Sequence, residues 1–136
     1  MSTAGYSGTP LFKKLGIKDG HNCHFKNIPD HYFDLLFDLP DIIVHEHIAE
    51  NSLDFIHLFC LDKAELESNF SDLKSALNST GSLWVSWPKK ISKIKSDLDG
   101  NIIRTYGLSM GLVDVKVAAI DSDWSGLKFM YRVKDR

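Results

Sequence analysis

Amines gather in one stretch of this sequence, and converging amines can hold an anion. Between Leu73 and Ser96 there are five lysines and no acid, whereas the segment from Asp30 to Asp72 carries eleven acids and one base. The five lysines are Lys74, Lys89, Lys90, Lys93 and Lys95. Their combined field could bind a phosphate or a nucleotide. The net charge of −2 and the acidic segment argue against an extended nucleic-acid duplex as the partner.

The candidate anion or ligand site combines lysines with two tryptophans near the expected strand ends. Its residues are Lys13, Lys14, Lys26, Asn27, Trp87, Lys89, Lys90, Trp124 and Lys128. A tryptophan beside lysines could stack on a base while the amines contact phosphates. The alternative, which we favour, is that both rings close the hydrophobic core and the lysines are only solvated. A ligand of this site would be a small anion or a nucleotide.

The other residues that could carry chemistry have no recognisable arrangement. Cys23 and Cys60 each lie in an apolar run, which predicts two buried thiols in a reducing compartment. His45 and His47 share one face of an expected strand, but the histidines lack the spacing of a zinc site, so no metal is expected. A nucleophile elbow, a P-loop and a glycine-rich dinucleotide fingerprint are all missing from the sequence. We therefore assign no catalytic residue.

The middle of the chain predicts a buried strand followed by an amphipathic helix. Leu53–Leu61 is nearly continuously apolar, as strands are in a parallel sheet that is covered on both faces. Asp62 is expected to cap the helix, with Glu65 completing a capping box. One apolar stripe along the helix should then face the sheet: Leu66, Phe70, Leu73 and Leu77.

A second buried strand organises the rest of the chain. The helix is expected to end near Asn78, and Thr80–Gly81 is expected to turn the chain into the short apolar strand Leu83–Val85. Pro88 should end that strand, because it has no N–H for a ladder hydrogen bond. This order of helix, turn and buried strand is one half of a βαβ unit.

The flanking elements follow from similar patterns. In the N-terminal part we expect a short helix that begins with Thr9 as N-cap and Pro10 and ends at Gly16, then a strand over Asn22–Asn27, a helix over Asp30–Leu39 and a strand over Asp41–Ile48. In the C-terminal part we expect a helix that starts at Asp97 or Asp99 and ends before Gly111, a covered strand over Leu112–Ile120, and an alternating strand over Leu127–Val133 with one wet face. The short loop between the last two strands makes them antiparallel.

Length and composition limit the class of protein. The 136 residues predict a single α/β domain, 1–136, in which residues 1–8 form a loosely held arm. The sheet is expected to be mainly parallel with an antiparallel final strand. Apolar runs stay far short of the roughly 20 residues that a membrane span needs, and the N-terminus does not read as a signal peptide. We therefore expect a cytoplasmic protein.

This order of elements resembles a shortened Rossmann-like fold of the methyltransferase type. Leu53–Trp87 resembles the fourth strand, the following helix and the fifth strand of those enzymes, and Gly111–Asp121 with Ser125–Val133 resembles their closing antiparallel pair. The whole chain also resembles a family of short bacterial proteins catalogued as a domain of unknown function. That match rests on Gly5–Leu11, Lys13–Gly16, Trp87–Lys90, Asp97–Leu98, Gly111–Lys116 and Trp124–Lys128.

One segment departs from the methyltransferase pattern. In those enzymes a glycine-rich turn after the first strand lets the backbone approach the cofactor, but here the segment Phe25–Asp30 contains no glycine. Ile28 and Pro29 should leave little freedom for a tight turn, so we expect no cofactor and, in particular, no S-adenosylmethionine bound in the usual way. Glu46 or Glu50 could be the acid that follows the second strand. A strand and its helix between Ile48 and Leu53 are missing.

Two functional hypotheses follow. The first, which the missing glycine turn favours, is a non-enzymatic binding or interaction domain with an anion or nucleotide site at the carboxyl ends of the strands. The alternative is a methyltransferase-related enzyme with an atypical cofactor loop. In both cases the ligand crevice is expected where the strand order reverses, lined by Lys26–Asn27, Leu61–Lys63 and Trp87–Lys90.

Overall fold

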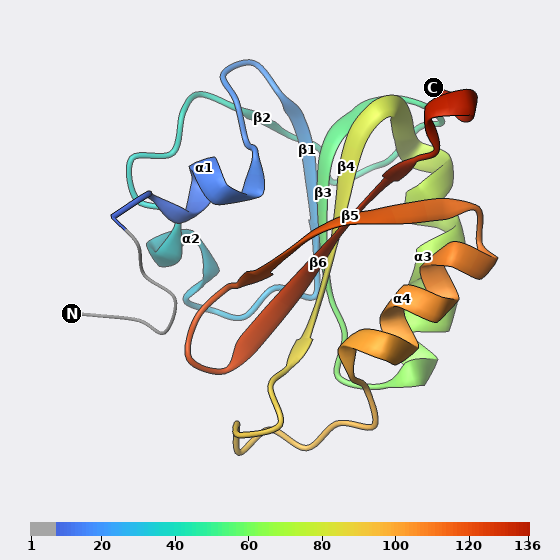
Figure 1. Cartoon of the computed structure of the whole chain (residues 1–136). Coiled ribbons are helices and arrows are strands. Elements are labelled where there is room, and N and C mark those ends of the chain that lie inside the picture. The colour runs from blue at the N-terminus through green and yellow to red at the C-terminus, as the bar shows by residue number, and fades with distance from the viewer. Residues whose placement is uncertain (1–7) are drawn as a thin grey trace.

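A computed structural model describes residues 8–136. They form one mixed sheet together with the helices and loops that surround it (Figure 1). The strand order is β2-β1-β3-β4-β6-β5. The strands are β1 (Asn22–Lys26), β2 (Ile43–Val44), β3 (Leu53–Phe59), β4 (Leu77–Pro88), β5 (Leu112–Ala119) and β6 (Trp124–Tyr131). Only β6 runs against the others, which confirms the expected α/β fold with a mostly parallel sheet. The expected arm at residues 1–8 lies, apart from Gly8, outside the described residues.

Helices cover both faces of this sheet. Figure 1 shows α1 (Leu11–Leu15) and α2 (Tyr32–Leu35) on one side, and α3 (Lys63–Ala76) and α4 (Gly100–Ser109) on the other. Each face has its own cluster of buried apolar side chains, and a short 3₁₀ helix, η1 (Val133–Asp135), follows β6. Among residues 8–136, no helix is long and apolar enough to cross a membrane.

The start of α3 agrees with the sequence pattern. Oδ1 of Asp62 accepts a hydrogen bond from the backbone N–H of Glu65 at 2.9 Å, and Oε1 of Glu65 accepts one from the N–H of Leu61 at 2.6 Å. One of the donors that a helix start leaves without partners, the N–H of Glu65, is thereby satisfied, while the Glu65 side chain bonds the residue before the N-cap and not the N-cap itself. The expected apolar stripe is buried at all four positions, Leu66, Phe70, Leu73 and Leu77.

Two neighbouring aspartates have different hydrogen-bond partners at the start of α4. Asp99 is the N-cap, and its Oδ1 accepts a hydrogen bond from the N–H of Ile102 at 2.8 Å. Oδ1 of Asp97 instead accepts from the N–H of Lys63 at 2.9 Å. Asp97 thus joins the loop after β4 to the first turn of α3, while Asp99 begins the helix.

The expected turn at Thr80–Gly81 is wrong, because α3 ends at Ala76 and β4 begins at the next residue. The residues after Leu77 instead form an irregularity inside β4, where the register against β3 shifts between Leu53 and Phe55. A Cβ at Gly81 would lie 2.8 Å from the carbonyl oxygen of Leu53, so this close approach of two backbones needs glycine. The glycine marks a bulge rather than a turn.

The N-terminal elements are shorter than expected. Helix α1 begins at Leu11 with Pro10 as N-cap and makes no side-chain capping bond, so Thr9 is not the cap. Its end is as expected, since Gly16 is left-handed with φ of 85°. The helix expected over 30–39 is only α2, and the strand expected over 41–48 is only the two residues of β2. Asp38, with φ of 60°, interrupts the helical run.

The last two strands differ in how far they match their expected burial. Strand β5 forms the edge of the sheet, and Val115, Lys116 and Val117 are exposed, so it is not a covered strand. Strand β6 lies between β4 and β5, and its expected alternation holds in part: Leu127 and Phe129 are buried, while Lys128 and Met130 are only partly exposed. Even Lys128 is half-buried there.

Candidate functional site

The carboxyl ends of the parallel strands define the edge of the sheet where a ligand is expected. The chain passes from β1 to β2 on one side and then to β3 on the other, so the strand order reverses between β1 and β3. In open α/β sheets, ligands bind outside the carboxyl ends of the strands at such a reversal. The amino end of β6 lies at the same edge, because Trp124 pairs with Pro88 at the end of β4.

A left-handed residue makes the turn after β1. Asn27 has φ of 58°, a conformation that glycine adopts freely and asparagine adopts more readily than other residues. This left-handed residue precedes Ile28 and Pro29, and the expectation that these two leave little freedom for a tight turn stays a prediction. Both Lys26 and Asn27 are exposed at this point. The end of β1 is thus marked by an exposed residue in the left-handed conformation.

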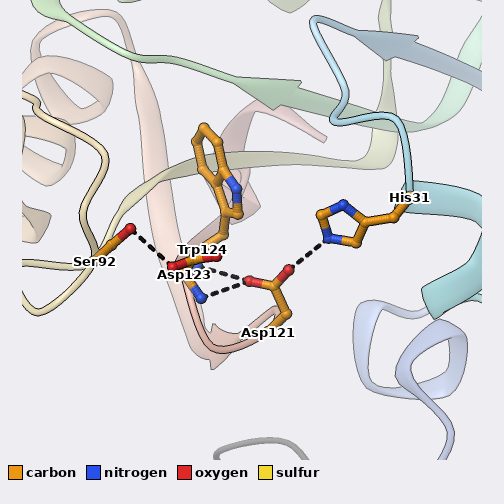
Figure 2. A network of polar contacts seen from close by, with 5 residues as sticks. All are labelled: His31, Ser92, Asp121, Asp123 and Trp124. Atoms are coloured by element: carbon orange, nitrogen blue, oxygen red, sulfur yellow. Dashed lines mark hydrogen bonds and ion pairs between the residues drawn. The ribbon is translucent and has the colours of Figure 1, made fainter.

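A hydrogen bond between two side chains joins the loop after β1 to the loop after β5. Nε2 of His31 lies 2.8 Å from Oδ2 of Asp121 (Figure 2). The side chain of Asp121 is only 8% exposed, whereas that of His31 is 48% exposed. Oδ1 of the same carboxylate accepts hydrogen bonds from the N–H groups of Asp123 at 2.8 Å and Trp124 at 2.9 Å. Asp121 is therefore fixed by the turn into β6 and presents one oxygen to the imidazole.

The loop after β4 is held by the same turn. Oγ of Ser92 donates a hydrogen bond to Oδ1 of Asp123 at 2.9 Å, and the carbonyl oxygen of Asp123 accepts one from the N–H of Lys89 at 2.8 Å. Figure 2 shows how this network reaches from Ser92 through Asp123 and Asp121 to His31. Three loops at the carboxyl edge, from β1, β4 and β5, are thereby fixed relative to one another.

An aromatic layer lies under these loops. The rings of Phe59 and Trp124 meet edge to face with centroids 4.9 Å apart, and Tyr32 meets Phe59 in the same way at 5.4 Å. Phe59 is the last residue of β3, so the layer spans the strand ends between the β1 loop and the start of β6. Aromatic pairs in this arrangement stabilise the core by about 0.5–1.5 kcal/mol beyond their burial.

A fully buried chain of polar side chains lies beside this layer, on the face of the sheet that α1 and α2 cover. The hydroxyl of Tyr32 lies 2.8 Å from Nδ1 of His57, and Nε2 of the same ring lies 2.7 Å from Oγ of Ser86. Burial lowers the pKa of His57 from its usual value of 6.5 to about 3 and raises that of Tyr32 well above 10. Both groups are therefore neutral near pH 7, and their hydrogen bonds offset the cost of burying them.

The lysines expected to form one anion site lie in two groups. Lys89, Lys90, Lys93 and Lys95 all line one hollow of about 450 Å³ in the loop after β4. Lys13 and Lys14 line another hollow of about 490 Å³ with Lys116, next to β5. Nζ of Lys116 donates to the carbonyl oxygen of Lys14 at 3.0 Å.

Lys128 belongs to the second group. A Cβ on Gly16 would lie 3.6 Å from its Nζ, at the end of α1. Burial, followed by the nearby charges of Lys116 and Lys18, lowers the pKa of Lys128. The second group is therefore an electropositive surface, on which neighbouring amines repel one another.

The two candidate tryptophans are core residues. Trp87 is 9% exposed and belongs to the cluster under α3 and α4, whereas Trp124 is 6% exposed and belongs to the cluster under α1 and α2. They lie on opposite faces of the sheet and do not form a common stacking surface. Trp87 still reaches a hollow of about 300 Å³ that it shares with Lys90 and Asp99.

The thiols are buried, as their apolar surroundings predict. Cys23 and Cys60 are free and have no exposed surface, and burial raises the pKa of each to about 12. Such thiols remain protonated and are poor nucleophiles. Across residues 8–136 no group of three or more histidine, cysteine or acidic side chains could hold a metal ion.

Sequence reasoning missed the residues of the polar network. His31 and Asp121 are separated by 90 positions, and His57 lies in an apolar run that is typical of a core strand. The only local signal was Asp121 two residues before Asp123, a spacing at which an aspartate side chain often accepts a backbone hydrogen bond within a turn. Nothing in the sequence indicated its partner.

Comparison with solved structures identifies the fold. A SAM-dependent methyltransferase from Aquifex aeolicus aligns with a TM-score of 0.64 and 12% identity over 90% of this chain and 88% of its own. A type 11 methyltransferase described as putative, from Sulfolobus solfataricus, aligns with a TM-score of 0.63 and 16% identity over 90% of both chains. The 1,6-didemethyltoxoflavin-N1-methyltransferase of Burkholderia thailandensis, with bound S-adenosylhomocysteine, aligns with a TM-score of 0.57 and 8% identity. The alignment covers 88% of this chain and 73% of that enzyme. No family model and no curated protein matches this sequence.

These similarities show that the chain has the Rossmann-like fold of methyltransferases. They also contradict the hypothesis of a non-enzymatic binding or interaction domain, because the solved chains that share the fold over nearly its whole length are methyltransferases. The alternative, a methyltransferase-related enzyme with an atypical cofactor loop, agrees better with these comparisons.

Proposed function

We propose that this protein is a methyltransferase-related enzyme that binds S-adenosylmethionine at the carboxyl ends of β1 and β3. The observation that carries the proposal is the sheet order, in which β6 lies antiparallel between β4 and β5. Solved methyltransferases superpose on this arrangement over about nine-tenths of the chain. We also propose that the protein is cytoplasmic and that it is related to the short bacterial proteins that its sequence resembles.

The residues at this edge suit such a cofactor. The left-handed turn at Asn27 leaves the backbone after β1 open to close approach. The exposed carboxylates of Asp30, in the same loop, and Glu46, two residues after β2, could accept hydrogen bonds from ammonium and ribose hydroxyl groups. When bound, the cofactor supplies an electrophilic methyl group on a sulfonium. The chain's own part would be to orient that methyl toward an acceptor and to keep water away.

Calorimetry with S-adenosylhomocysteine tests the proposal. We expect micromolar binding that survives Asn27→Gly, because glycine keeps the left-handed turn, and that weakens at least tenfold in Asn27→Val, because a branched residue disfavours it. Asp72→Asn, on the exposed face of α3, is the matched control and should bind normally. Absence of binding to the unaltered protein would refute the cofactor assignment.

A second candidate function, binding of an anion, is favoured by the hollow after β4. Four lysines and no acid line it: Lys89, Lys90, Lys93 and Lys95. We propose that this hollow holds a phosphate or carboxylate group of the acceptor. The other proposed ligand-binding residues, Lys13, Lys14, Lys26 and Lys128, would then add only to the general field at this side of the molecule.

A further inference from the structure

The His31–Asp121 pair joins two loops at the carboxyl edge of the sheet, where the proposed site lies. His31 follows the β1 loop, and Asp121 precedes the hairpin into β6, so their contact bridges from one side of the carboxyl edge to the other. In the sheet, β3 and β4 lie between β1 and the β5–β6 hairpin. Ligands of open α/β sheets bind outside the carboxyl ends of the strands, so a group held there is close to where substrate and cofactor are expected.

The geometry orients the imidazole of His31. Nε2 points at a carboxylate that two backbone N–H groups, those of Asp123 and Trp124, already hold in place. Because a carboxylate only accepts hydrogen bonds, it selects the form of the neutral ring that carries its proton on Nε2. Nδ1 is then an acceptor, and within residues 8–136 it has no hydrogen-bond partner.

We propose that His31 is a general base that takes a proton from a hydroxyl or amine acceptor during methyl transfer, with Asp121 as its positioning residue. This inference rests on the proposed function. It names the acceptor class, because a carboxylate or thioether acceptor has no proton to lose and would need no base at this position.

The step balances in atoms and electrons. The acceptor oxygen or nitrogen forms the bond to the methyl carbon as the carbon–sulfur bond breaks, and that electron pair stays on sulfur as a neutral thioether. The acceptor's proton moves to Nδ1 of His31. The carboxylate of Asp121, 2.8 Å from Nε2, stabilises the resulting imidazolium. The exposed part of the ring then returns the proton to solvent.

The arrangement could instead serve only to hold two loops together, and substitutions separate these roles. In Asp121→Asn the side-chain oxygen can still accept from Asp123 and Trp124, while its amide donates to Nε2 and moves the ring proton to Nδ1. The loop contact is kept and the base is lost. His31→Gln removes the imidazole, and His21→Gln is the matched control, since His21 lies before β1 at the opposite edge.

Nitrogen-15 NMR of the histidine rings is the first measurement and needs no acceptor. We expect the His31 proton on Nε2 in the unaltered protein and on Nδ1 in Asp121→Asn. A proton on Nδ1 in the unaltered protein would overturn the proposal.

The second measurement follows S-adenosylhomocysteine formation from S-adenosylmethionine with a phenol, a primary amine, a carboxylic acid and a thioether. His31→Gln and Asp121→Asn should slow transfer to the phenol or amine by about 10²–10⁴-fold. Both variants should bind S-adenosylhomocysteine as the unaltered protein does. Unchanged rates in His31→Gln, or no transfer to phenol and amine by protein that binds S-adenosylhomocysteine, would overturn the inference. Loss of that binding in unaltered protein would instead refute the proposed function.

Discussion

His57 on β3 and Ser86 on β4 lie side by side inside the sheet, with Nε2 of the imidazole 2.7 Å from the serine Oγ and both side chains fully buried. The hydroxyl of Tyr32 occupies the other ring nitrogen. A protonated ring would be a buried charge without a carboxylate in contact, which is why burial lowers its pKa to about 3. The folded protein therefore keeps this histidine neutral over a wide range of mild acidity.

This depressed pKa predicts an acid-sensitive stability. In the unfolded chain His57 takes up a proton below its usual pKa of 6.5, whereas in the folded protein it does so only near 3. The unfolded state thus binds more protons in this window, and the free energy of unfolding falls with pH by up to about 1.4 kcal/mol per unit from this residue. Urea denaturation of the unaltered protein and His57→Gln at several pH values measures the effect. Parallel pH dependences would show that His57 does not contribute.

Phe70 should be among the most important core residues. It has no exposed surface and meets Tyr106 and Phe129 edge to face, with centroids 5.3 and 5.8 Å apart. Phe70→Ala should lower the free energy of unfolding by about 3–5 kcal/mol. The exposed neighbour Ser71 provides the control, and Ser71→Ala should change it by less than about 0.5 kcal/mol. A cost below about 1 kcal/mol for Phe70→Ala would mean that α3 does not pack as described.

Gly107 lets α4 approach β6. A Cβ on this residue would overlap the ring of Phe129. Gly107→Ala should therefore destabilise the protein by about 1–3 kcal/mol, although alanine normally favours a helix by about 1 kcal/mol. When Phe129→Ala removes the ring, the same substitution should become neutral or stabilising. Thermal or urea denaturation of the four proteins in this cycle gives the coupling, and additive effects would refute the contact.

The parts of the fold that the sequence predicts well are those in which local signals and burial agree. Helix α3 carries its capping residues and its apolar stripe within one segment, so its start at Asp62 is encoded locally. The helix expected over 30–39 has similar spacing, but Phe33 and Phe37 are exposed and only one turn is regular. Gly81 is a turn residue by type, yet contact with the backbone of Leu53 makes it part of a strand. Tertiary contacts override local preference at these places.

The sequence predicts where the candidate site lies, but it does not predict which residues form it. Parallel strands bring their carboxyl ends together, and this rule alone places the Asn27 loop and Lys89 at one edge. The pairing of His31 with Asp121 depends on how two loops fold over that edge, and no spacing encodes it. The sequence also did not indicate that Asn27 adopts the left-handed conformation, because asparagine adopts it more readily than most residues but does not require it.

The final prediction concerns the lysines after β4. Lys90 is exposed and Lys89 is half-buried, and both line the hollow that we propose as an anion site. Charge reversal should weaken the local field, so Lys89→Glu with Lys90→Glu should reduce retention on heparin and binding of inorganic phosphate at low salt. The melting temperature should change little, because neither side chain forms a salt bridge within residues 8–136.

A matched double reversal isolates the effect of position from that of net charge. Lys134→Glu with Arg136→Glu changes the charge equally at the exposed C-terminus, away from the hollow. If the hollow binds the anion, only the Lys89 and Lys90 reversals should abolish phosphate binding, whereas both pairs should lower heparin retention somewhat through the general field. Equal losses of phosphate binding in the two double variants, or no binding by the unaltered protein, would show that these lysines only keep the loop solvated.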